Sequence, residues 1–181
     1  MTDARSPLTI RILNADPHAY EKLVVEEGAP ALAHELLDGV QANQLLSDPG
    51  TPPAKARAML AGLWLWHDAL DESHTISQGL HDATGSFWHA IMHRREGDFS
   101  NSKYWYTRAA GHPALAALAM QAGPILANEP ADKLLLRIVN RGFEADALVD
   151  LIEELHDNPQ DPRRHVAVAL QQLEWRVLFN S

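Results

Sequence analysis

Proline beside a capping or helix-breaking residue occurs at five places and divides the chain into short segments. The five sites are Asp16-Pro17, Thr51-Pro52-Pro53, His112-Pro113, Glu129-Pro130 and Asp161-Pro162. Proline is favoured in the first turn of a helix, because its missing N–H would have no acceptor there. Between these sites apolar residues recur at helical spacing. The pattern predicts helices at 17–27, 30–47, 53–81, 86–96, 101–110, 113–127, 131–141, 143–156 and 162–179.

Evidence for β-strands is confined to the N-terminus, where Leu8, Ile10 and Ile12 alternate with polar residues. A single strand without a partner in the sequence is more typical of an extended arm, which we place at residues 1–15. The length of 181 residues fits one domain. We therefore expect an all-α fold, a single-domain irregular bundle of about eight to nine helices over residues 1–181.

The composition excludes several classes of site. The chain has no cysteine, which rules out disulfides, cysteine-ligated zinc, iron–sulfur clusters and thiol nucleophiles. It also lacks a G-x-G-x-x-G turn, a P-loop and a G-x-S-x-G elbow, so nothing predicts nucleotide binding or α/β-hydrolase chemistry.

Charge and hydropathy predict where the protein acts. Fifteen basic residues against twenty-four acidic ones give a net charge of −9, which disfavours nucleic acids and anionic membranes as partners. No apolar run reaches the roughly 20 residues that span a bilayer, and no signal peptide is recognisable. We expect an acidic protein in the cytoplasm, because a chain without cysteine fits a reducing compartment in which disulfides are rare.

Histidines are the main candidates for a functional site, and six of the ten lie between residues 67 and 112. Within the predicted helix 53–81, His67, His74 and His81 repeat every seven residues and form one stripe. Asp71 and Gln78 share that face. The opposite face of the same helix is apolar, so we expect the stripe to contact protein and not bulk water.

The following segment repeats this arrangement. His89 and His93 are one helical turn apart, and Glu96 shares their face. The short connection at 82–85 predicts an antiparallel hairpin, which places His74 opposite His93. Together the two helices give one candidate cluster, which consists of His67, Asp71, His74, Gln78, His89, His93 and Glu96.

Three imidazoles beside one or two carboxylates suit a divalent transition metal such as Zn²⁺, Fe²⁺, Mn²⁺ or Ni²⁺. No established metal motif is complete, however. The zincin motif needs a glutamate after the first histidine, and Ala90 stands there. A di-iron bundle needs two Glu-x-x-His motifs, and this cluster has Asp71-x-x-His74 and the reversed His93-x-x-Glu96 in their place. Three interpretations therefore stay open: a buried hydrogen-bond network, a metal site, and a metal-free acid–base or ligand site.

Aromatic residues offer a second candidate site. The run Tyr104-Trp105-Tyr106 cannot turn entirely inward on one helix. Basic residues lie near it in the sequence. A pocket for an anionic or ring-bearing small molecule is therefore predicted, lined by Trp88, Arg95, Lys103 and Tyr104.

The central third of the chain contains the blocks HDALDESH at 67–74, TGSFWHAIMHRRE at 84–96 and DFSNSKYWY at 98–106, and QLEWRVLF follows at 172–179. In these blocks the chain resembles a family of uncharacterised, mostly bacterial, helical proteins. The resemblance implies an all-helical fold and draws attention to this block. It implies no activity.

In the shorter segment 86–113, Gly97-Asp98 stands at the turn between two predicted helices, small Ser102 and aromatic Tyr106 take packing positions, and Pro113 stands at the end. This arrangement resembles one tetratricopeptide hairpin. His89 and His93 depart from that pattern. Two functions follow as hypotheses: a helical protein that binds a metal or small molecule at the cluster, with enzymatic activity left open, and a helical interaction module whose histidines are structural.

Overall fold

Ten α-helices and one 3₁₀ turn make up the regular structure of the residues that the computed structural model describes, which are 5–48, 50–127 and 129–181. Within these ranges the only β-type pairing is an isolated bridge between Arg5 and Leu46. The helices are α1 (Pro7–Leu13), α2 (Ala31–Leu37), α3 (Pro53–Trp66), α4 (Leu70–Ser77), α5 (Ala83–Arg95), α6 (Phe99–Arg108), α7 (Pro113–Leu126), α8 (Lys133–Val139), α9 (Ala145–Asp157) and α10 (Arg164–Phe179), with the 3₁₀ turn η1 at Ala42–Gln44.

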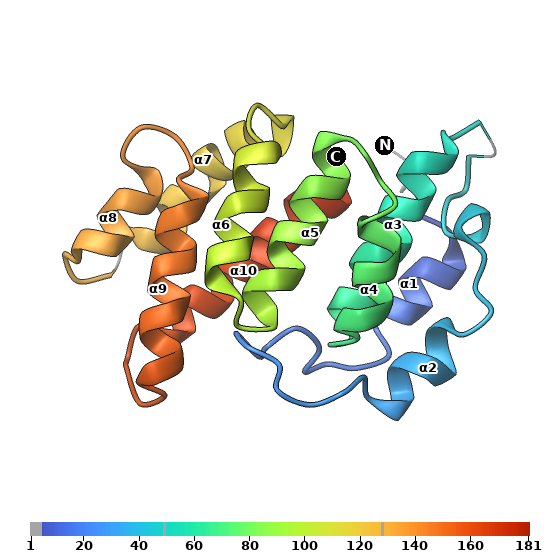
Figure 1. The fold of residues 1–181 in the computed structure, drawn as a ribbon, viewed down its shortest axis with the longest axis horizontal. Coiled ribbons are helices and arrows are strands. Elements are labelled where there is room, and N and C mark those ends of the chain that lie inside the picture. Colours follow the sequence, from blue (N-terminus) through green and yellow to red (C-terminus); the bar gives the residue numbers. More distant parts are fainter. Residues whose placement is uncertain (1–4, 49, 128) are drawn as a thin grey trace.

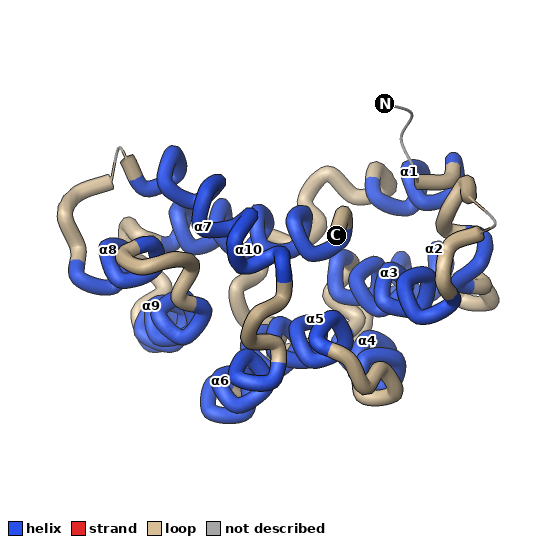
Figure 2. Tube along the Cα trace, turned by 90° about the horizontal axis from the view of Figure 1, so that it is seen from above, coloured by secondary structure: helices blue, strands red, loops and turns tan. Residues whose placement is uncertain are grey.

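The predicted all-α bundle is confirmed. Neighbours in sequence pack as antiparallel pairs, among them α3 with α4, α4 with α5, α5 with α6 and α8 with α9 (Figure 1). Helix α10 crosses behind the α5–α6 pair and lies beside α7 (Figures 1 and 2). None of the described helices is long and apolar enough to cross a membrane.

Aspartates cap the N-termini of the two central helices, α5 and α6. The carboxylate of Asp82 accepts a hydrogen bond from the Gly85 N–H at 2.8 Å, and that of Asp98 accepts one from the Asn101 N–H at 3.1 Å. Such N-caps satisfy amides that have no partner inside the helix. Gly97, with φ of 86°, makes the turn between α5 and α6. The Asp82 and Gly97-Asp98 signals thus fix the limits of α5.

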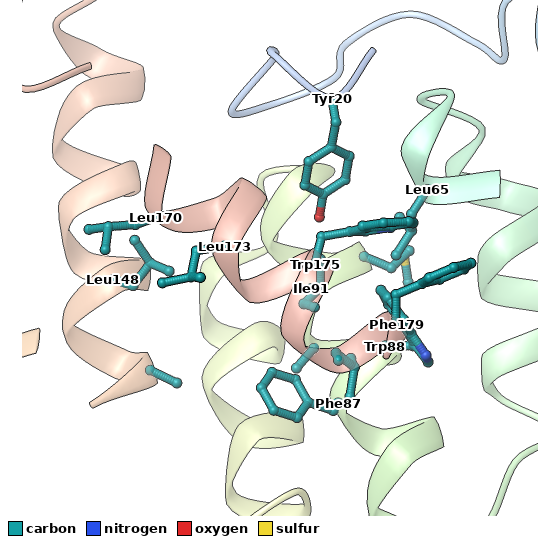
Figure 3. Close-up of a cluster of buried hydrophobic side chains, with 14 of the residues drawn as sticks. Tyr20, Leu65, Phe87, Trp88, Ile91, Leu148, Leu170, Leu173, Trp175 and Phe179 are labelled. Atoms are coloured by element: carbon teal, nitrogen blue, oxygen red, sulfur yellow. The ribbon is translucent and has the colours of Figure 1, made fainter. Parts of the chain in front are cut away.

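The aromatic core joins α3, α5 and α10. Trp88 of α5 and Trp175 and Phe179 of α10 are almost fully buried and lie together (Figure 3). The Trp175 indole donates a hydrogen bond to the Gly62 carbonyl at 2.8 Å. A Cβ at Gly62 would lie 2.8 Å from Cζ2 of Trp88, so glycine there allows α3 and α5 to approach.

A buried ion pair joins α5, α6 and α10. Arg94 and Glu174 are both fully buried, and their side chains meet at 2.5 Å. The Tyr106 hydroxyl donates to the other carboxylate oxygen of Glu174 at 2.7 Å. Burial of either charge without its partner would strongly destabilise the fold, so Arg94 and Glu174 each need the other in this position.

The helix predicted at 53–81 is wrong as one element, because α3 ends at Trp66 and α4 begins at Leu70. Asp68, at the break, has a φ of 61°. Arg95 donates to the Leu65 carbonyl at 2.6 Å and contacts the Asp68 carboxylate at 2.5 Å. A tertiary contact thus replaces the hydrogen bonds that a continuous helix would make at this point.

The N-terminal expectation is also wrong. Residues 7–13 form α1 and are not part of an extended arm, whereas 17–27 is irregular instead of helical. The Ser6 hydroxyl caps α1 at the Thr9 N–H, and Pro7 occupies the first turn. Tyr20, with φ of 64°, cannot continue a helix. The first four residues of the predicted arm lie outside the described residues.

Candidate metal centre

Three histidines from α4 and α5 converge at one place. His74, His89 and His93 each offer a ring nitrogen, and the three nitrogens lie within 4.8 Å of one another. The ring centroid of His74 is 4.7 Å from that of His89 and 5.5 Å from that of His93. The antiparallel hairpin predicted from the short 82–85 connection is thereby confirmed, including the placement of His74 opposite His93.

Burial of the cluster follows from the central position of α5. Its residues from Gly85 to Arg95 are all buried, because α3, α4, α6 and α10 surround it. His89 is 4% exposed and His93 is 7% exposed. His74, on the outer helix α4, is only partly buried. The cluster is therefore nearly closed, with its accessible side at His74.

Hydrogen bonds determine the tautomer of His93. Its Nδ1 lies 2.5 Å from a carboxylate oxygen of Glu96, and its Nε2 lies 3.1 Å from the side-chain amide nitrogen of Asn101. The carboxylate accepts and the amide donates. Nδ1 therefore carries the hydrogen, and the Nε2 lone pair accepts the Asn101 hydrogen, which a metal ion at Nε2 would displace. Carboxylate–histidine contacts of this kind orient metal-ligating imidazoles in many proteins.

His89 has no hydrogen-bond partner at either ring nitrogen, although both nitrogens are buried. Burial lowers the pKa of His89 to about 4, and the neighbouring His93 and His74 contribute to the shift. The imidazole is thus neutral at pH 7, with a lone pair available. A buried nitrogen without a partner costs about 1–3 kcal/mol, so it calls for an explanation.

Aromatic contacts hold the His89 ring in place. It stacks on Trp105 of α6 at a centroid distance of 4.1 Å and on His93 at 4.6 Å, with interplanar angles of 20° and 16°. A metal receives each lone pair in the plane of its imidazole. Binding of one ion by both residues therefore requires His89 or His93 to rotate out of this parallel stack.

A second group of candidate ligands adjoins the first. A carboxylate oxygen of Glu96, one of Asp98 and a ring nitrogen of His93 lie within 4.8 Å of one another. Both carboxylates are at exposed residues. Asp98 already accepts hydrogen bonds from the Asn101 N–H and the Ser100 hydroxyl, and the first of these lowers its pKa. This group thus extends the cluster toward solvent through its shared member, His93.

Three predicted members of the cluster lie elsewhere. His67, after the end of α3, donates a hydrogen bond from Nε2 to the Ile12 carbonyl at 3.0 Å. Asp71 and Gln78 are exposed, and Asp71 belongs to no group of converging His, Asp and Glu side chains in the described part of the chain. A break at Asp68 separates α3 from α4, so His67 does not share the helical face of Asp71, His74 and Gln78.

The residues predicted to line an aromatic pocket are dispersed. Trp88 belongs to the core, and Arg95 is fully buried in its contacts with Leu65 and Asp68. Lys103 pairs with Asp150 of α9 at 2.5 Å, whereas Tyr104 is 54% exposed.

Sequence reasoning missed the roles of Trp105 and Asn101 at the histidine cluster. The signal was present in the turn at Gly97. A hairpin centred there pairs residues equally far from it, which places Trp105 opposite His89 and Asn101 opposite His93.

No protein-family model, curated protein or solved structure matches this chain. The resemblances to an uncharacterised bacterial family and to a tetratricopeptide hairpin stay predictions.

Proposed function

We propose that this protein binds one divalent transition-metal ion through His74, His89 and His93. The observation that carries the proposal is His89, a buried neutral imidazole with no hydrogen-bond partner, between two other histidines. A metal ion would use a lone pair that the folded chain otherwise leaves unsatisfied.

The ligand set favours a particular class of ion. Imidazoles without thiolates suit Zn²⁺, Ni²⁺, Fe²⁺ or Cu²⁺ better than Ca²⁺ or Mg²⁺, which prefer oxygen. Three histidines leave at least one coordination position for water or a small ligand. Glu96 would act on the site through His93, because its carboxylate fixes the tautomer that presents Nε2.

The alternative function is a helical interaction module with purely structural histidines. Structural imidazoles in a protein interior are hydrogen-bonded as a rule, as His67 and His112 are here. His89 departs from that rule, and this difference favours the metal proposal.

The test uses untagged protein and two kinds of measurement. Elemental mass spectrometry of the purified chain gives its metal content, and calorimetric titration of the chelator-treated protein with Zn²⁺, Ni²⁺, Fe²⁺ and Cu²⁺ gives affinity and stoichiometry. The variant His89→Phe keeps an aromatic ring on Trp105 and removes the ligand. His81→Gln is the matched control, because His81 is exposed on the same hairpin.

We expect about one metal ion per chain for the natural protein and for His81→Gln, with at least a tenfold weaker affinity in His89→Phe. Equal affinities of the natural protein and His89→Phe would assign the ion to other groups. A failure of all four metals to bind would favour structural histidines.

A further inference from the structure

A cavity of about 390 Å³ lies on another side of α5 from the histidine cluster. It is bordered by α3, α5, the start of α7 and the end of α10. Its apolar wall includes Ala58, Met59, Trp88, Pro113, Leu178 and Phe179. Small-molecule sites are commonly cavities of roughly 300–1,000 Å³ with apolar walls and a few polar groups. The polar groups here share a property that indicates what they bind.

The first polar group is a hydroxyl whose hydrogen is left without an acceptor. His112 accepts the Ala114 N–H at its Nδ1, at 3.1 Å, so the hydrogen of this neutral ring is on Nε2. Burial lowers the pKa of His112, which keeps the ring neutral at pH 7. Nε2 then donates to the Thr84 hydroxyl oxygen at 3.1 Å. The Thr84 hydroxyl is thereby polarised, and its own hydrogen is free to be donated.

The second polar group is the indole N–H of Trp88. The side chain is 1% exposed, and no acceptor in the described part of the chain pairs with its Nε1. The Nε1 atom nevertheless keeps some accessible surface. Trp88 follows Thr84 by four residues, so the two side chains share one face of α5.

The third polar group is Lys55 of α3, one turn before Met59. The Lys55 ammonium has no ion-pair partner among the described residues. The cavity also has one acidic residue, Asp82, whose Oδ1 is occupied by the Gly85 N–H. Three unpaired donors, an ammonium, a hydroxyl and an indole N–H, therefore outnumber the one carboxylate oxygen that is left over, Oδ2 of Asp82.

We propose that this cavity binds a small monocarboxylate with an apolar body, the carboxylate directed to Lys55, Thr84 and Trp88 and the body against Met59 and Phe179. A carboxylate offers only acceptors, which is what three unsatisfied donors require. The apolar wall selects a ring or a short alkyl chain. The proposal is independent of the metal centre, because the two sites share no residue.

The probe is 4-phenylbutyrate, compared with 4-phenylbutan-1-ol, which has the same apolar body and no charge. Binding is followed by ¹H–¹⁵N correlation spectra of the tryptophan indoles, with the Trp88 signal assigned from Trp88→Phe. Lys55→Met removes the charge and keeps the length of the side chain. Lys133→Met is the matched control, since Lys133 is an exposed lysine at the start of α8. Ala54→Trp fills the mouth of the cavity.

We expect the carboxylate to shift the Trp88 indole signal with saturation, and to bind at least fivefold more tightly than the alcohol. Lys55→Met should remove this preference without changing the affinity for the alcohol, Lys133→Met should change neither, and Ala54→Trp should abolish binding of both. Equal affinities for the two probes, an unshifted Trp88 signal or unchanged binding in Ala54→Trp would each overturn the proposal.

Discussion

The imidazole of His89 lies parallel to the indole of Trp105, with ring centroids 4.1 Å apart. Dispersion and stacking hold the ring at this contact, and no hydrogen bond orients it. The position therefore combines a fixed aromatic ring with two unused nitrogens. This combination connects the packing of α5 and α6 to the proposed metal centre.

Replacement of His89 by phenylalanine should not destabilise the metal-free protein. Phenylalanine keeps the stack on Trp105 and removes two buried nitrogens that have no partners, so we expect an unchanged or up to about 1 kcal/mol higher free energy of unfolding. Urea unfolding of chelator-treated protein measures it. His67→Phe is the comparison, because it removes the side-chain hydrogen bond to the Ile12 carbonyl, which keeps only backbone donors, and should lose about 1 kcal/mol. A loss above 1 kcal/mol in His89→Phe would show that the imidazole is satisfied.

The pH dependence of stability gives a second prediction for the metal-free protein. Burial lowers the pKa of His89 in the folded state to about 4, below the value near 6.5 of an unfolded chain. The unfolded state therefore binds more protons between these two values. Stability should be full above pH ~6.5 and fall as the pH decreases, by about 1–2 kcal/mol at pH 5.

Two neighbours of His89 are themselves imidazoles, His74 and His93, and the nearest carboxylate, Glu96, is bonded to His93. The control is therefore His89→Phe, whose urea midpoints between pH 8 and pH 5 should decrease less. His67 and His112, whose pKa values burial also lowers, contribute to both proteins equally. Superimposable profiles would remove His89 as the cause.

The sequence allowed the α4–α5 hairpin and the meeting of His74, His89 and His93 to be predicted, since helical spacing and a short connection are local features. The break at 67–69 could not be predicted, because it depends on a long-range contact: Arg95, 27 residues further along the chain, donates a hydrogen bond to the Asp68 carboxylate. The same break separated His67 from the predicted face. Helix α1 was missed although Ser6-Pro7 is a good start signal, since its apolar residues also alternate as in a strand.

The buried pair of Arg94 and Glu174 should respond differently to single and double substitution. Glu174→Gln leaves the Arg94 guanidinium buried without a counter-charge, and we expect a loss of about 3–5 kcal/mol. In Arg94→Met/Glu174→Gln no charge is unpaired, and the Gln oxygen can accept the Tyr106 hydroxyl. The double variant should therefore be more stable than Glu174→Gln alone, which a double-mutant cycle of urea unfolding measures. Additive losses would contradict the pairing.

Two glycine substitutions should have opposite signs. In Gly62→Ala the new Cβ would lie 2.8 Å from Cζ2 of Trp88 and 3.2 Å from Cδ2 of Phe179, so we expect a loss of about 1–3 kcal/mol. In Gly28→Ala the Cβ meets nothing within 4 Å. That variant should gain about 0.4–1 kcal/mol, because alanine restricts the unfolded chain. Thermal unfolding of the two proteins compares them. A neutral Gly62→Ala would mean that α3 and α5 are free to separate.

The central claim is that one metal ion is held by three particular imidazoles, and long-range ¹H–¹⁵N NMR of the histidine side chains tests it most directly. Before metal is added, His93 should show the tautomer with hydrogen on Nδ1, and His89 should be neutral at pH 7. One equivalent of Zn²⁺ should shift a ring nitrogen of His74, His89 and His93, with Nε2 as the ligand atom in His93. The rings of His67 and His112 should stay unchanged, since neither belongs to a group of converging candidate ligands in the described part of the chain. Shifts at exposed histidines in place of these three, or unaltered His89 nitrogens at saturating Zn²⁺, would contradict the account.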